Sequence, residues 1–229
     1  MNTLTKKITT LIFLGVFSVS SLALPGIPKL GGMFGGDKDE SESETEPMDL
    51  ATAQSALERT LRNALGELNE AEYYFAQARG DGEAAAISKR RADILKGEKD
   101  IDIKESLDET ALSREKGAEF EANAGELSAD SKALYVQGLV PYAKGVAETA
   151  NAANQAQGFV EAMTAEVTSI RNLRKIKELK TTFAPAIAIG KIMPGFFKTL
   201  GASTKGIFSF AKAQKLNTKN AEASLPDDF

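Results

Sequence analysis

The sequence predicts an all-α fold, an elongated antiparallel helical bundle with coiled-coil-like heptads, preceded by a disordered acidic linker. Three observations lead to this prediction. Apolar residues recur at helical spacing over most of the 229 residues, strand-like alternation is confined to residues 186–189, and Gly, Pro and acidic residues gather before residue 50. We therefore divide the chain into a signal peptide (1–23), a linker (24–49), a helical bundle (50–180), an apolar cationic segment (181–216) and a tail (217–229).

The N-terminal residues have the pattern of an export signal. Lys6 and Lys7 precede an uncharged apolar stretch over residues 8–24, and Ser21-Leu22-Ala23 places small residues at the two cleavage positions. We predict cleavage after residue 23. The alternative is a retained membrane anchor, because the stretch is nearly long enough to span a bilayer. The protein is expected to be exported, either to the periplasm or out of the cell. Peripheral attachment to a membrane is a further option.

Residues 24–49 combine proline, glycine and acidic side chains. Gly and Pro are costly in regular structure, and residues 37–49 carry seven acids and one Lys. These acids repel one another and offer little apolar surface to bury. The segment is therefore predicted to be a solvated, disordered linker.

A sustained heptad pattern follows the linker and predicts a helix that ends at Gly80-Asp81-Gly82. Its apolar residues are alternately four and three positions apart, which places them on one face. They are Leu57, Leu61, Ala64, Leu68, Ala71, Phe75 and Ala78.

A second helical stretch is predicted from residue 83 to about residue 127. Its apolar stripe consists of residues one heptad apart, namely Ile87, Ile94 and Ile101. Gly97 and Gly117 weaken the helix, so two pieces are an alternative.

A third helical stretch is predicted from Ser128, a residue type that caps helix N-termini, to about residue 180. Pro141 is expected to kink this helix and Gly158 to offer a point of division.

Charge is unevenly distributed along the chain. Residues 8–157 hold 15 basic and 26 acidic side chains, whereas residues 158–220 hold 11 basic and 3 acidic ones. On a helix a seven-residue step turns a side chain by only about −20°, so residues seven apart form one slowly drifting stripe. Five lysines in the cationic segment have this spacing: Lys191, Lys198, Lys205, Lys212 and Lys219.

Two interpretations are open for the segment over residues 181–216. Its apolar face either covers the bundle core while the lysines point into water, or lies in a membrane interface while the lysines meet anionic headgroups. Pro194-Gly195 and Gly201 are expected to interrupt the helix. The residues assigned to membrane or partner contact are Lys191, Phe196, Phe197, Lys198, Lys205, Ile207, Phe208 and Lys212.

Composition narrows the chemistry, because the chain contains no Cys, His or Trp. Disulfides, Cys/His zinc sites and His-based triads are excluded, although a carboxylate-only site for a hard cation stays open. No combination of nucleophile, base and orienting group is visible. We therefore expect no catalytic residues, no cofactor and no metal site.

The first functional hypothesis is a non-catalytic, exported interaction or scaffold protein of the cell envelope. Its expected partner is an anionic membrane surface or an acidic protein, with a homo-oligomer as a further option. No nucleic-acid partner is expected, because the basic triplet Lys89-Arg90-Arg91 belongs to an acidic chain.

The alternative is a helical pore-forming or lytic protein that inserts residues 183–212. Long amphipathic helices beside an apolar segment resemble helical pore-forming toxins in architecture. The third hypothesis is a lipid carrier.

Overall fold

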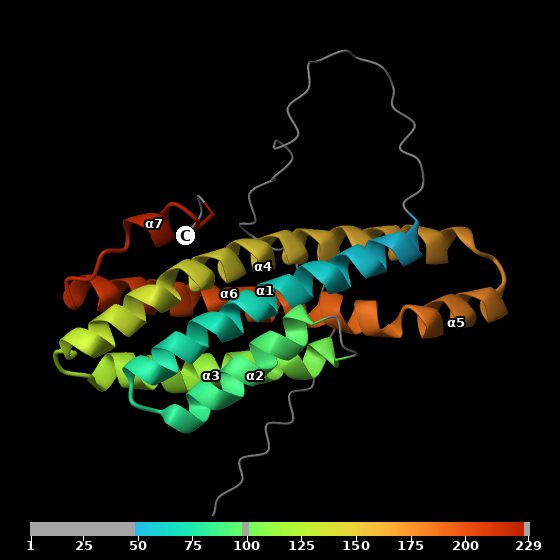
Figure 1. The fold of residues 1–229 in the computed structure, drawn as a ribbon. Coiled ribbons are helices and arrows are strands. Elements are labelled where there is room, and N and C mark those ends of the chain that lie inside the picture. The colour runs from blue at the N-terminus through green and yellow to red at the C-terminus, as the bar shows by residue number, and fades with distance from the viewer. Residues whose placement is uncertain (1–48, 98–100, 227–229) are drawn as a thin grey trace, which may run out of the picture. The chain divides into compact units, whose positions relative to one another are not determined.

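The computed structural model describes residues 49–97 and 101–226. Over these residues the chain forms seven helices packed as a bundle and no strand, which confirms the all-α prediction (Figure 1). The predicted signal peptide and all of the predicted linker except Asp49 lie outside the described residues. The helices are α1 (Leu50–Ala78), α2 (Gly82–Lys96), α3 (Ile103–Asn123), α4 (Ala129–Ser169), α5 (Leu173–Thr182), α6 (Ala184–Ala213) and α7 (Lys219–Glu222).

Helix α1 is the centre of the bundle and contacts α2, α3 and α4. Its N-cap is Asp49, whose carboxylate accepts hydrogen bonds from the backbone N–H groups of Ala51 and Thr52. All seven residues of the predicted heptad face are buried, with exposed fractions of 4% or less. The predicted apolar face of this helix is therefore confirmed.

The approach of α1 to α4 depends on two glycines of α4 that are seven residues apart. A Cβ atom at Gly138 would lie 2.6 Å from the Phe75 ring and 3.0 Å from the Ala71 carbonyl oxygen. A Cβ atom at Gly145 would lie 2.7 Å from the Leu68 side chain. Later residues of α4 thus face earlier residues of α1, so the two helices run in opposite directions.

The second predicted stretch forms two helices, α2 and α3, as in the two-piece alternative, and its isoleucines are not its most buried residues. Ile87 is 40% exposed, and Ile94 and Ile101 are only partly buried. The buried side chains of α2 are instead mostly small: Ala85, Ser88, Ala92 and Leu95. Small side chains let α2 lie close to α1, and the regularly spaced isoleucines lie outside this most buried face.

Of the two glycines expected to weaken the second stretch, one ends a helix and the other does not. Gly97 caps the C-terminus of α2, whereas Gly117 lies inside α3. Helix α4 starts at the predicted cap, where the Ser128 hydroxyl accepts from the Ser131 N–H. It runs for 41 residues through Pro141 and Gly158 and ends at Ser169, earlier than predicted. Asn172 then caps α5.

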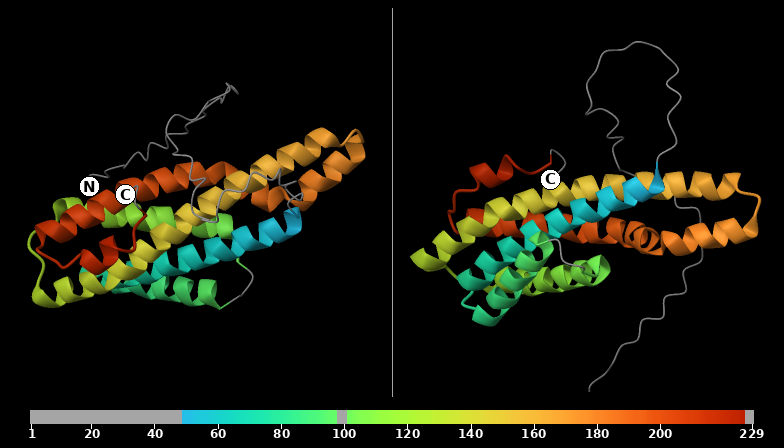
Figure 2. Two further views of the ribbon diagram at one scale, coloured as in Figure 1. Left: turned by 90° about the horizontal axis from the view of Figure 1, so that it is seen from above. Right: turned by 45° about the vertical axis from the view of Figure 1, so that its right-hand side comes forward.

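Helix α6 is continuous through Pro194, Gly195 and Gly201, so the predicted interruption was wrong. It lies along α4 in both views of Figure 2. Its buried residues belong to the same hydrophobic clusters as those of α1 and α4, so α6 is part of the bundle. These residues include Ala186, Ile189, Met193, Leu200, Ile207, Phe208, Phe210 and Ala211.

Candidate functional site

Helix α6 displays four lysines on its exposed side, and we name Lys191, Lys198, Lys205 and Lys212 the lysine stripe. The Lys212 Nζ atom lies 2.7 Å from Glu222 Oε1 of α7. The other three lysines form no ion pair with any residue that the structure describes. Because α6 is one unbroken helix, the seven-residue spacing keeps the stripe on one side.

Lys219, the fifth lysine of the predicted stripe, is not on α6. Helix α6 ends at Ala213, and Lys215 adopts a positive φ of 59° in the turn that follows. Lys219 then begins α7, a separate short helix. The stripe therefore contains four lysines and not five.

The predicted apolar contact residues face the interior of the bundle. Ile207 is 0% and Phe208 is 7% exposed, and both pack in the cluster around Phe75. Phe196 is partly buried and packs against two of the three clusters, and Phe197 is also partly buried. In the folded bundle the apolar face of α6 thus covers the core, as in the first interpretation of the sequence.

A buried charge cluster joins α1 to α3, and sequence analysis did not find it. The Arg114 guanidinium donates from Nη1 to Glu72 Oε2 and from Nη2 to Glu121 Oε1, both at 2.9 Å. The three side chains are only 3–5% exposed. Arg79 also pairs with Glu72, and the Tyr135 hydroxyl donates to Glu121 Oε1 at 2.8 Å. The cluster therefore combines two arginines with two glutamates.

Arg114 stays charged in this setting. Burial acts to lower its pKa, but the carboxylates of Glu72 and Glu121 act more strongly together and raise the pKa above its ordinary value. The guanidinium carbon also lies 5.5 Å from the centre of the Phe75 ring and 5.8 Å from that of Tyr142. Two aromatic rings of the core thus lie beside the paired cation.

The cluster is linked to α6 through Tyr142 of α4. Its hydroxyl lies 3.1 Å from Thr204 Oγ1, and burial raises the pKa of Tyr142 to about 12. Arg114 acts in the opposite direction on that pKa. The charges of the cluster are paired and its side chains are almost completely buried. The cluster is therefore suited to hold α1, α3 and α4 in one arrangement rather than to bind a substrate.

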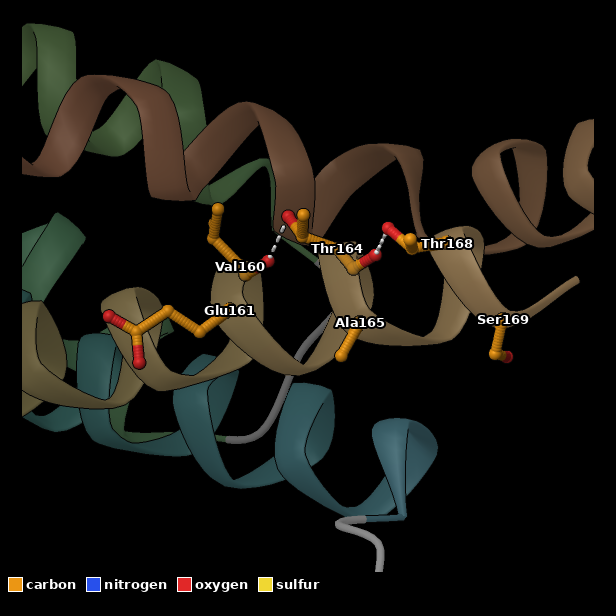
Figure 3. A pocket seen from close by; sticks show the side chains of 6 residues that line it. All are labelled: Val160, Glu161, Thr164, Ala165, Thr168 and Ser169. Carbon is orange, nitrogen blue, oxygen red and sulfur yellow. Dashed lines mark hydrogen bonds between the residues drawn. The ribbon is translucent and has the colours of Figure 1, made fainter. Parts of the chain in front are cut away.

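A shallow surface groove runs along the C-terminal part of α4 (Figure 3). Its polar side chains are already bonded to their own helix, since Thr164 Oγ1 donates to the Val160 carbonyl and Thr168 Oγ1 to the Thr164 carbonyl, both at 2.7 Å. The one carboxylate in the lining, that of Glu161, accepts a hydrogen bond from Gln157 Nε2 at 2.9 Å. The groove is lined by Val160, Glu161, Thr164, Ala165, Thr168 and Ser169.

Comparisons with protein-family models, curated proteins and solved structures found no match to the chain. Within residues 49–97 and 101–226, no group of three or more metal-binding side chains is placed to hold an ion. In the same part of the chain, each helix is either too short or too polar to cross a membrane.

Proposed function

We propose that the protein is a non-catalytic, exported helical protein of the cell envelope that attaches to an anionic membrane surface through the lysine stripe. One observation carries the proposal. Four exposed lysines lie on one side of an unbroken helix, and three of them form no ion pair with the described residues. The opposite side of that helix packs on the core, so the stripe is presented by a folded scaffold.

The spacing of the stripe suits a flat, negatively charged surface. Lys191 and Lys212 are separated along the helix axis by about 32 Å, given a rise of about 1.5 Å per residue. Each lysine near an anionic membrane contributes about 1 kcal/mol, and salt screens that attraction. The stripe therefore supports reversible attachment that weakens as ionic strength rises.

Surface attachment leaves the bundle intact, whereas insertion of residues 183–212 does not. Insertion would remove Leu200, Ile207 and Phe208 from the core, and burial of each such side chain is worth about 1.5–3 kcal/mol. Lipid contacts would have to replace these core contacts. We therefore favour attachment over the pore-forming alternative.

Co-sedimentation with vesicles tests the proposal. Wild-type protein is expected to bind vesicles of equal parts phosphatidylglycerol and phosphatidylcholine at low salt, but not vesicles of phosphatidylcholine alone. Lys198→Glu with Lys205→Glu should lower the affinity by about 30-fold or more, because each lysine contributes roughly a factor of five. Arg90→Glu with Lys144→Glu is the control, since both residues are exposed and the net charge changes equally.

Absence of wild-type binding to the anionic vesicles would overturn the membrane proposal and leave an acidic protein as the partner of the stripe. Equal weakening by the stripe variant and the control would show that net charge matters and the stripe does not. Release of a dye trapped in the vesicles would instead support the pore-forming alternative.

A further inference from the structure

The turn from α4 into α5 exposes an apolar side chain at the end of the bundle, and we name residues 170–180 the hairpin tip. Leu173, the first residue of α5, is 82% exposed. No residue of α5 is fully buried, and Leu179 is a partly buried residue that packs against the core. Figure 1 shows α5 beyond the connection that follows α4, on the way back to α6. Single exposed apolar side chains are common on folded proteins, so the exposure of Leu173 gains meaning only together with the charges around it.

The hairpin tip is also strongly basic. It contains five basic side chains and one acid, Glu178. Glu178 Oε1 accepts from Arg174 Nε at 3.0 Å, and both side chains are well exposed. No other basic side chain of the tip forms an ion pair with the described residues. These four are Arg171, Lys175, Lys177 and Lys180.

Leucine and lysine share one side of α5. Lys177 and Lys180 follow Leu173 by four and seven residues, which places all three on the same helix face. Leu179 lies on a different face and packs against the cluster of Phe159, Met163, Phe183 and Ala186. The face with Leu173 is therefore turned away from the contact that fixes α5 to the bundle.

We infer that the hairpin tip is a second membrane contact, in which Leu173 enters the interface of an anionic bilayer while Lys177 and Lys180 bind phosphate headgroups. This inference rests on the proposed membrane attachment and adds the part of the chain that penetrates. A lipid surface fits better than a protein partner. A stable protein interface needs about 800 Å² per partner with an apolar centre, whereas a bilayer accepts one apolar side chain with a set of cations.

Tryptophan fluorescence tests penetration directly, because the chain has no Trp of its own. Leu173→Trp supplies a single fluorophore at the tip, and Leu112→Trp supplies a matched one on α3, where Leu112 is 54% exposed. Addition of phosphatidylglycerol–phosphatidylcholine vesicles should shift the emission of Leu173→Trp to the blue and leave that of Leu112→Trp unchanged.

Equal responses of the two variants, or none in either, would overturn the inference. A blue shift with soluble polyglutamate but not with vesicles would overturn it too and indicate an acidic protein partner.

Charge reversal separates failure of this inference from failure of the proposed function. Lys177→Glu with Lys180→Glu should weaken vesicle binding by about 30-fold, as two lysines each contribute roughly a factor of five. Loss of binding in the Lys198→Glu, Lys205→Glu variant but not in the tip variant would overturn the inference alone. Loss in the tip variant but not in the stripe variant would support the tip and overturn the assignment of the stripe. Failure of wild-type protein to bind would overturn both.

Discussion

Arg114 of α3 and Glu72 of α1 form an ion pair with 2.9 Å between Nη1 and Oε2, and their side chains are 4% and 3% exposed. The two residues are 42 positions apart in the chain. A pair buried to this extent stabilises the fold weakly compared with an apolar pair, but loss of one partner leaves the other as an uncompensated charge in the core. The cluster is thus most sensitive to changes that remove a single charge.

Arg114→Met should therefore lower the free energy of unfolding by about 3–5 kcal/mol, because Glu72 and Glu121 lose the cation between them. Urea unfolding followed by circular dichroism measures the loss. Lys104→Met is the control, since Lys104 forms an exposed pair with Asp108 and its removal should leave the urea midpoint nearly unchanged. Adding Glu72→Gln and Glu121→Gln to Arg114→Met should recover part of the stability. A loss as small as that of the control would show that the carboxylates accept a proton or water without cost.

The glycines between α1 and α4 give a second prediction. Gly145→Ala should destabilise by about 1–3 kcal/mol, because its Cβ would lie 2.7 Å from the Leu68 side chain and 3.0 Å from the Ala64 carbonyl oxygen. Gly158→Ala is the matched control on the same helix. Nothing lies within 4 Å of its Cβ position, so alanine should stabilise by about 0.5–1 kcal/mol through its helix propensity. Thermal unfolding of both variants tests this, and equal effects of the same sign would contradict the close packing at Gly145.

Helix α1 and the exposure of the lysine stripe could be predicted because their signals are local and periodic. The heptad from Leu57 to Ala78 needs only the sequence of one helix, as does the seven-residue spacing of the lysines. The isoleucines of α2 show the limit of such reasoning. Their spacing is equally regular, but α2 lies close to α1 and buries the face that carries mostly small side chains.

The charge cluster and the hairpin tip could not be predicted, because each depends on tertiary structure. Nothing in the sequence distinguishes Glu72 from the neighbouring Glu67 and Glu70, and its partner lies on another helix. The exposure of Leu173 depends on α4 ending at Ser169. The continuity of α6 through Pro194 could not be predicted either, because proline in a sequence indicates an interruption and only the structure shows that this helix runs through it.

Tyr142 gives the third prediction, on stability at alkaline pH. Its pKa is raised to about 12, mainly by burial, whereas an unfolded tyrosine titrates near pH 10. Above about pH 10 the folded state therefore holds a proton that the unfolded state has lost, and stability falls by up to about 1.4 kcal/mol per pH unit until about pH 12. Below pH 10 the contribution is constant.

Urea unfolding of wild type and Tyr142→Phe between about pH 9 and pH 11 should show a shallower fall in the variant. An equal fall of stability with pH in wild type and variant would mean that the Tyr142 hydroxyl is not buried away from water.

The fourth prediction distinguishes attachment of the intact bundle from insertion of α6. Val160 of α4 faces Gly190 of α6, with Val160 Cγ2 2.6 Å from where a Cβ atom on residue 190 would lie. That proximity suits the Cβ–Cβ separation of a disulfide, about 3.5–4.5 Å. Since the chain has no native Cys, Val160→Cys with Gly190→Cys should form one defined crosslink between the two helices.

The crosslinked protein should bind anionic vesicles as tightly as wild type, because the lysine stripe and the hairpin tip both stay exposed while α6 remains on α4. Co-sedimentation of the oxidised and reduced forms in parallel measures this, and the reduced form controls for the substitutions themselves. In the pore-forming alternative α6 must leave α4, so oxidation should abolish both tight binding and dye release, and reduction should restore them. Binding that appears only after reduction would therefore contradict surface attachment, because it would show that the core face of α6, with Ile207 and Phe208, has to reach the lipid.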